Sequence, residues 1–296
     1  YLKAHYPQAF MAALLTAHFG NLDKIAIEIG ECRRLGIKII PPDINKSFVE
    51  FGVDPETKNI IFSLAAIKGV GTMVAEIIQE ERKQNGVYKS LTDFIKRMPK
   101  NIINRKTMES LIKAGVFDSF YERNQLLQSL DEILKFAYQF NKNNQTNQLG
   151  LFAGNIENLK IPKVEPLNKK DKLNFEKEYL GLYLSDHPLN EYRAILTKLS
   201  TPFSKVNNTT NGQRVRIGGL IENCQKIITK NGKLMLFSKL EDLSNNKIEV
   251  VVFPDILEKS KNLWQENNVI LVDGKINNYD GEMKVICESV RTIESI

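Results

Sequence analysis

Two glycines separated by one residue form the most specific chemical motif in this sequence. Gly69 and Gly71 flank Val70 inside the segment LAAIKGVGTMVAEII, residues 64–78. Glycines permit a tight turn and let a backbone approach another molecule closely. A helix that starts at Thr72 would then offer N–H groups and a partial positive charge to a phosphate. Contacts of this kind hold a polynucleotide without reading its bases, and Lys68 can add charge.

The residues around these glycines predict a helix-hairpin-helix, with one helix ending at Ile67 and the next beginning at Thr72. The alternative is an ordinary corner between two helices. A weaker copy follows in LIKAGVF, residues 111–117, after a helix capped by Asn104. Two such units in tandem would straddle a duplex backbone. The candidate duplex-binding residues are Lys68, Gly69, Val70, Gly71, Thr72, Lys113 and Gly115.

Positive charge is concentrated next to these motifs. The 296-residue chain carries a net charge of +6, and residues 82–113 alone hold nine Lys or Arg against two acids. A concentrated basic surface suits a polyanion, whereas the alternative is a solvated helical face.

A short apolar peptide interrupts a polar stretch. NKNNQTN, residues 141–147, is typical of a linker, and QLGLF follows at once. Such a peptide either inserts into a partner's pocket or folds back on its own domain. Its candidate binding residues are Gln148, Leu149, Leu151 and Phe152.

The periodicity changes from helical to alternating near residue 213. Before it, Phe10, Ala13, Leu14 and Ala17 follow helical spacing, and a second helix is expected near Asp23 with Ile25, Ile29 and Cys32 on one face. After it come strand candidates at 214–221, 234–240, 248–253, 269–275 and 283–286, with a helix at 256–265. We therefore expect a multidomain α+β chain, mainly α over its first two thirds, followed by a five-stranded OB-type barrel.

Barrels of this type often bind single strands through basic and aromatic side chains. Phe237 and Lys239 share a face of the second strand, and packing of Phe237 against a neighbouring domain is the alternative. The candidate single-strand-binding residues are Arg216, Lys226, Lys230, Lys233, Phe237 and Lys239.

The sequence gives no candidate catalytic or metal-ligating residues. Two-metal phosphoryl transfer needs closely placed carboxylates, but the chain has no Asp-x-Asp, and the nearest pair, Glu176 and Glu178, points apart on a helix. It has no phosphate-binding Gly-x-x-x-x-Gly-Lys loop. The three cysteines, Cys32, Cys224 and Cys287, are too dispersed for a zinc site. No apolar stretch approaches 18 residues, which excludes a membrane span.

In this order the motifs resemble one family, the α subunit of bacterial DNA polymerase III, a C-family replicative polymerase. YLKAHYPQAFMAALL and ECRRLGIKIIPPDIN resemble the family's fingers, AAIKGVG and LIKAGVFDSF its tandem helix-hairpin-helix, and QLGLF its internal clamp-binding motif. EKEYLGLYLSDHPL, residues 176–189, is similar to a signature of this family, and VRIGGLI opens a region similar to its OB domain.

The resemblance implies five segments: the end of the fingers at 1–62, the tandem duplex-binding domain at 63–140, a linker at 141–172 with the clamp motif at 148–152, a helical connector at 173–212, and the OB domain at 213–296. Since the chain starts at Tyr1, we expect an excised piece. It would lack the palm carboxylates that hold magnesium in the parent DNA-directed DNA polymerase, so it would be inactive alone and need no cofactor. A further C-terminal domain that contacts the clamp loader would be cut off or lacking.

The implied partners are primer–template DNA, single-stranded template, the sliding clamp and other polymerase III holoenzyme subunits, with no membrane, in the cytoplasm. One rival interpretation is a non-catalytic helix-hairpin-helix and OB module of a repair or ligase-type protein, which would not need the clamp peptide. A second is an interaction protein whose barrel binds protein; its binding to DNA would be absent or insensitive to salt.

Overall fold

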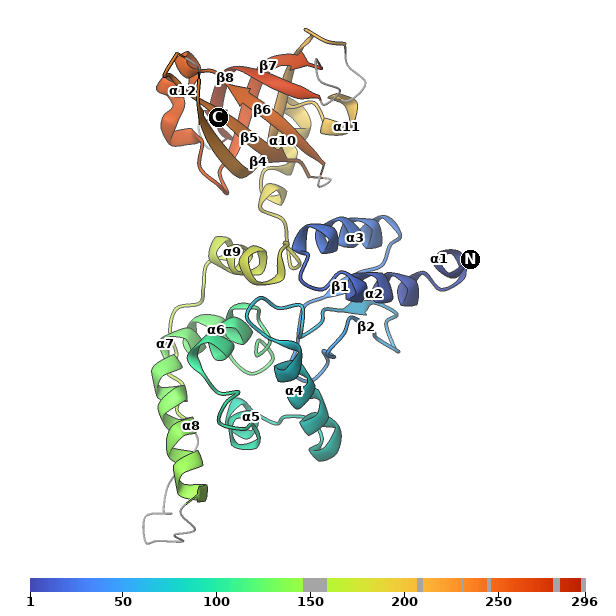
Figure 1. Cartoon of the computed structure of the whole chain (residues 1–296), viewed down its shortest axis with the longest axis vertical. Helices are drawn as coiled ribbons and strands as arrows, with labels where there is room; N and C mark the ends of the chain where they lie inside the picture. Colours follow the sequence, from blue (N-terminus) through green and yellow to red (C-terminus); the bar gives the residue numbers. More distant parts are fainter. Residues whose placement is uncertain (146–158, 207–209, 230, 244–245, 279–282, 294–296) are drawn as a thin grey trace. The chain divides into compact units, whose positions relative to one another are not determined.

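The computed structural model describes residues 1–145, 159–206, 210–229, 231–243, 246–278 and 283–293. The described chain divides into two compact units, Tyr1–Ser185 (unit 1) and Asp186–Ile296 (unit 2). Figure 1 shows mainly helices in unit 1 and a β-barrel in unit 2, as the sequence predicts.

Unit 1 is built around one hydrophobic core that runs from Met11 to Leu182. Its elements are α1 Leu2–His5, α2 Pro7–Ala17, α3 Leu22–Arg34, β1 Ile39–Ile40, β2 Gly52–Val53, β3 Ile60–Ile61, α4 Thr72–Asn85, α5 Leu91–Arg97, α6 Arg105–Lys113, α7 Arg123–Gln128, α8 Leu130–Gln145 and α9 Lys169–Leu180. The short strands form a sheet in the order β1-β3-β2. One core shared by the expected fingers and hairpin segments means that residues 1–62 and 63–140 fold against each other.

The first two long helices form where the periodicity predicts them. Ile25, Ile29 and Cys32, expected on one face of α3, are all buried. In α2 the buried residues are Met11, Ala12 and Leu15, whereas Ala13 and Ala17 are exposed. Alanine fits either face of a helix, so its spacing does not identify the buried stripe.

The helix expected to end at Ile67 is absent from the described structure. Residues 64–69 form turns instead, with the Val70 N–H donating to the Ile67 carbonyl at 2.9 Å. The Ser63 hydroxyl accepts the Ala66 N–H at 3.1 Å, and β3 ends only two residues before Ser63. The segment is therefore too short for more than about one turn.

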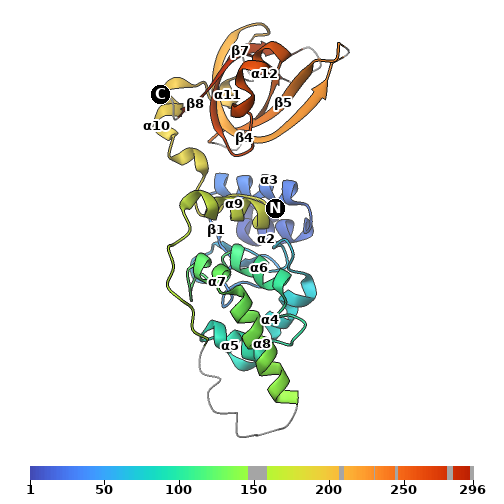
Figure 2. The same ribbon diagram turned by 90° about the vertical axis from the view of Figure 1, so that its left-hand side faces the viewer.

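Unit 2 is a closed barrel with strand order β4-β5-β6-β8-β7, and β7 pairs back with β4. All of its strand pairs are antiparallel except β6 with β8. Its elements are η1 Pro188–Asn190, α10 Arg193–Leu199, α11 Phe203–Val206, β4 Arg214–Ile228, β5 Leu234–Glu241, β6 Lys247–Val252, α12 Pro254–Ser260, η2 Lys261–Leu263, β7 Val269–Asn277 and β8 Lys284–Thr292. Figures 1 and 2 show the strands curling around one axis, which confirms the predicted barrel.

Two strands are longer than the sequence predicts. β4 continues beyond Ile221 to Ile228, after a bulge between Ile221 and Asn223, and this second half pairs only with β5. β8 continues to Thr292 beside β7, whose register shifts between Asp273 and Gly274. A bulge interrupts the alternation of apolar and polar residues on which the prediction depended.

The expected connector, residues 173–212, is divided between the two units. α9 packs against α6 inside unit 1, and Figure 2 also shows these two helices side by side. In contrast, α10 packs on β4 inside unit 2. No helix among the described residues is long and apolar enough to cross a membrane.

Candidate nucleic-acid interface

The first hairpin, Ile67–Thr72, is anchored by two apolar residues and open elsewhere. Ile67 and Val70 are buried, whereas Lys68, Gly69, Gly71 and Thr72 are exposed. Gly69 has φ +87°, and a Cβ there would overlap the Ser110 hydroxyl of α6. Glycine is therefore required at 69 both for the left-handed backbone and for the close approach to α6.

Helix α4 begins directly after this hairpin, and the residues at its start, Gly71 to Met73, are exposed. Its N-cap is Gly71, which has no side chain to accept an amide hydrogen, and its first turn contains no acid. A Cβ on Gly71 would meet nothing within 4 Å, so the space beside the N-cap is open. Unpartnered amides and the positive end of the helix dipole attract an anion to this point.

Lys106 lies beside the first hairpin but is not among the duplex-binding residues predicted from the sequence. It lies on α6, and its Cε is 3.8 Å from the position of a Gly69 Cβ. Its side chain is exposed, as is that of Lys68. The two lysines are 38 positions apart, and the packing of the hairpin on α6 places Lys106 beside Gly69, the residue after Lys68. Local spacing therefore carries no signal for the pair.

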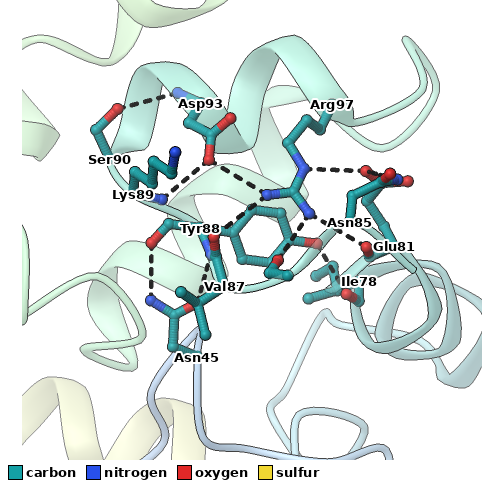
Figure 3. Close-up of polar contacts among 11 residues, drawn as sticks. Asn45, Ile78, Glu81, Asn85, Val87, Tyr88, Lys89, Ser90, Asp93 and Arg97 are labelled. Carbon is teal, nitrogen blue, oxygen red and sulfur yellow. Dashed lines mark hydrogen bonds and ion pairs between the residues drawn. The ribbon is translucent and has the colours of Figure 1, made fainter. Parts of the chain in front are cut away.

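The opposite end of α4 is fixed by a cluster around Arg97, drawn in Figure 3. The Arg97 guanidinium lies 4.4 Å from the Tyr88 ring centroid and donates to Glu81 at 2.9 Å and to Asp93 at 3.2 Å. Burial raises the pKa of Tyr88 to about 12, and the Tyr88 hydroxyl donates to the Ile78 carbonyl. Both ends of α4 are thus held, and its N-terminus points in a fixed direction.

The second hairpin, Lys113–Arg123, is held together by hydrogen bonds between its own residues. Arg123, whose side chain is 6% exposed, donates to Asp118 through both Nε and Nη2 and to the Lys113 carbonyl at 3.1 Å. Its Nη2 is also 3.9 Å from the buried carboxylate of Glu176. Gly115 has φ +84°, and a Cβ there would overlap the Arg123 guanidinium. The glycine of this hairpin makes room for an internal arginine.

Lys113 also faces inward. Its ammonium donates to Glu109 at 2.6 Å and lies 5.2 Å from the Phe175 ring centroid and 5.4 Å from that of Tyr179, both on α9. Burial alone would lower the pKa of Lys113, but hydrogen bonds to Glu109 and Tyr179 outweigh it and raise the pKa. The structure gives Lys113 protein partners on several sides.

The helix after the second hairpin has an acid at its start. Glu122 caps α7 by accepting the Asn124 N–H at 2.7 Å, and it also accepts the Leu167 N–H at 3.1 Å. Burial would raise the pKa of Glu122, but these amides and Lys172 lower it below its ordinary value. A carboxylate of the chain itself therefore accepts amide hydrogen bonds at the start of α7.

The nine basic residues of 82–113 separate into two groups. Three of them are only partly exposed and bind groups of the protein itself: Arg82 the carbonyls of Ile44 and Ser47, Arg97 its cluster, and Lys113 the carboxylate of Glu109. The other six are exposed: Lys83, Lys89, Lys96, Lys100, Lys106 and Arg105, which pairs with the exposed Asp131. The charge total therefore overstates the positive surface that a polyanion can reach.

On the barrel, Phe237 and Lys239 share the outer face of β5. Phe237 pairs with Gln225 of β4 and Val251 of β6, and Lys239 with Glu249. The ammonium of Lys284 on β8 lies 5.7 Å from the Phe237 ring centroid and 2.8 Å from Glu249. Lys284 is not among the sequence-based candidates because β8 is distant from β5 and β6 in the sequence. The parallel pairing of β8 with β6 brings Lys284 next to Glu249.

The other barrel candidates lie elsewhere or have partners. Arg216 donates to Asp273 at 2.5 Å on the β7 side of β4, and this bond raises its pKa. Lys226 is exposed, and Lys233 lies 3.9 Å from Asp255. The structure therefore brings together only Phe237 and Lys239 of this set. Lys230 and the peptide 148–152 lie outside the described residues.

Comparison with known proteins identifies both regions. Residues 36–126 match a family model described as a helix-hairpin-helix motif, and residues 215–293 match one described as an OB-fold nucleic acid binding domain. Among solved structures, the mitochondrial single-stranded DNA binding protein Rim1 from S. cerevisiae aligns with 28% of this chain and 96% of its own at 14% identity and a TM-score of 0.24. That likeness is too small to support an argument.

Sequence similarity to curated proteins covers the whole chain. The DNA polymerase III α subunit of Thermus aquaticus is 36% identical over 100% of this chain, and that of Borreliella burgdorferi is also 36% identical over 100%. The subunit of Escherichia coli K12 is 33% identical over 99%. The chain spans only 24% to 26% of the length of these relatives. This chain therefore belongs to the DNA polymerase III α subunit family, and it matches about a quarter of the subunit.

Proposed function

We propose that this chain is the DNA-holding part of a bacterial replicative polymerase and that its first hairpin holds the primer–template duplex. The observation that carries the proposal is the exposed α4 N-terminus, which has no acid in its first turn and follows an open Gly71. Amides in this arrangement hold a phosphate, and the exposed Lys68 and Lys106 add positive charge close to the hairpin. The matched helix-hairpin-helix model over residues 36–126 supports this assignment.

The test is titration of labelled duplex at two salt concentrations. Wild-type affinity is expected to fall steeply with salt, and the pair of changes Lys68→Ala and Lys106→Ala to weaken binding further and to flatten the salt dependence. The control is the pair Lys83→Ala and Lys89→Ala, which removes equal charge near the far end of α4. Binding that ignores salt, or equal losses in both double variants, would contradict the proposal.

The barrel is proposed to guide single-stranded template. Support comes from Phe237 beside Lys239 on an outer strand face, since a ring next to a cation suits base stacking and phosphate contact. Phe237→Ala with Lys239→Ala should weaken binding of a single-stranded oligonucleotide. Lys259→Ala with Lys261→Ala, exposed lysines at α12 and just after it, should leave binding within about two-fold. If the two double variants behave alike, the assignment of this face is wrong.

The peptide Gln148, Leu149, Leu151 and Phe152 is proposed to dock on the sliding clamp. Its support is the resemblance of QLGLF to the family's clamp motif. A tether of this kind raises the concentration of the enzyme at the primer end. Binding of the chain to a clamp should be lost when Leu151→Ala and Phe152→Ala are combined, and unchanged affinity would rule out the tether.

The parent subunit is proposed to be a magnesium-dependent DNA-directed DNA polymerase that works in the cytoplasm with other holoenzyme subunits. Residues 1–62 would contribute to the wall of its active site. Among the described residues, no three His, Cys, Asp or Glu side chains are grouped as metal ligands. The chain alone is expected to add no nucleotide in a primer-extension assay, and incorporation would contradict this expectation.

A further inference from the structure

Helix α9 places two aromatic side chains against the hairpin region. It begins after Asn168, which accepts the Asp171 N–H, and ends at Gly181 in the left-handed conformation. Phe175 and Tyr179 are four residues apart and therefore lie on one face. That face meets α6, and both rings lie near the ammonium of Lys113.

Tyr179 contacts both hairpins. Its backbone carbonyl accepts the Lys68 N–H of the first hairpin at 2.9 Å, and its hydroxyl lies 3.4 Å from the Lys113 Nζ of the second. The carbonyls of the last turn of a helix have no partner inside the helix. The first hairpin supplies the partner that the Tyr179 carbonyl lacks.

This bond fixes the peptide that precedes Gly69. Gly69 has φ +87°, and glycine has more backbone conformations available to it than other residues. Ile67 and Val70 anchor the hairpin on both sides, and the Lys68 amide is held between them. A hairpin that is already ordered does not lose backbone conformational entropy when it binds a ligand, so its binding is stronger.

The Lys113 cluster holds α9 in place for this contact. The Lys113 ammonium has Glu109 on its own helix and Phe175 and Tyr179 on α9 as neighbours. Cation–π contacts of this kind attract an ammonium to the faces of nearby aromatic rings. Lys113 of the second hairpin thus fixes the position of α9, and α9 in turn forms a hydrogen bond with the first hairpin.

We propose that Tyr179 is a positioning residue for duplex binding, which it supports by fixing the first hairpin through α9 without touching the DNA. The inference rests on the proposed function of the first hairpin. It assigns a DNA-binding contribution to a residue more than a hundred positions downstream of that hairpin, in a segment expected from sequence to be a connector.

The test compares Tyr179→Ala, Tyr179→Leu and Tyr179→Phe in the full chain. Hydrogen exchange at the Lys68 amide reports the hairpin, exchange in α3 reports the rest of unit 1, and duplex titration across salt reports binding. Tyr179→Ala and Tyr179→Leu should accelerate Lys68 exchange and weaken duplex binding roughly ten-fold, with the salt slope unchanged because no phosphate contact is lost. Tyr179→Phe keeps the ring on Lys113 and should stay within about two-fold of wild type.

Each other outcome overturns the inference in a recognisable way. If duplex affinity and Lys68 exchange are the same in all three variants, Tyr179 does not position the hairpin. If affinity falls together with a decrease in salt slope, this region touches phosphate directly. If Lys68 exchange responds but the wild-type chain binds no duplex, the failure lies in the proposed function and not in the contact.

Discussion

The two glycine hairpins of unit 1 start from similar sequences and form different surfaces. IKGVGT leads into a helix with a glycine cap, no acid in its first turn and exposed lysines beside it. IKAGVF leads to Arg123, locked on Asp118, and to a helix capped by Glu122. We expect from this difference that a glycine turn alone does not define a phosphate site. The residues that occupy the following helix N-terminus decide whether an anion can bind there.

The largest effect on the free energy of unfolding is expected from Arg123→Ala in the second hairpin. It leaves Asp118 without its arginine and removes the cation near the buried Glu176, so the free energy of unfolding should fall by about 3 kcal/mol. The control is Arg105→Ala, which breaks the exposed ion pair with Asp131 and should cost under about 1 kcal/mol. Urea unfolding measures both. Equal losses would mean that the Arg123 network does not hold this hairpin.

A smaller effect separates the two glycines of the first hairpin. Gly69→Ala forces a left-handed backbone onto alanine and overlaps Ser110, which should cost about 2 kcal/mol of stability. Gly71→Ala meets open space and should change stability by less than about 0.5 kcal/mol, yet it should weaken duplex binding because its Cβ stands where a phosphate approaches. Thermal unfolding and duplex titration measure the two quantities. Full duplex affinity in Gly71→Ala would argue against a close approach of DNA.

The smallest effect concerns the acid cap of the second hairpin and depends on pH. The pKa of Glu122 is lowered in the folded chain, so its carboxylate stabilises the fold above the unfolded pKa, and this contribution is lost as pH falls through the folded pKa. At pH 7 Glu122→Gln should therefore be about 1 kcal/mol less stable than wild type. Chemical unfolding at pH 7 and at pH 3 should show this difference shrinking in acid. A difference that is constant with pH would mean that the charge does not matter.

Much of the fold could be predicted because its signals are local. The barrel follows from alternating strands with turns between them, and α3 follows from Ile25, Ile29 and Cys32 at helical spacing. The missing helix before Ile67 could not be predicted, because its residues suit a helix and only the short distance from β3 prevents one. The lengths of β4 and β8 depend on bulges, which interrupt the alternation.

The candidate site could be predicted only in part. The exposure of Lys68, Gly69, Gly71 and Thr72 agrees with the expectation for the first hairpin, while their contact with DNA stays a prediction. Lys113 has the same local pattern as Lys68, and its inward orientation depends on α9, which follows 56 residues later. Lys106, Lys284 and Tyr179 were missed because only tertiary packing brings them next to Gly69, Phe237 and the two hairpins, respectively.

The most direct measurement is the salt dependence of duplex binding in Lys68→Ala and Lys113→Met, compared in the full chain. Each lost phosphate contact lowers the slope of log affinity against log salt by about 0.9. We predict this decrease for Lys68→Ala and an unchanged slope for Lys113→Met, whose side chain keeps its apolar contact with α9. A decrease for Lys113→Met and none for Lys68→Ala would contradict the assignment of the first hairpin as the duplex-binding surface.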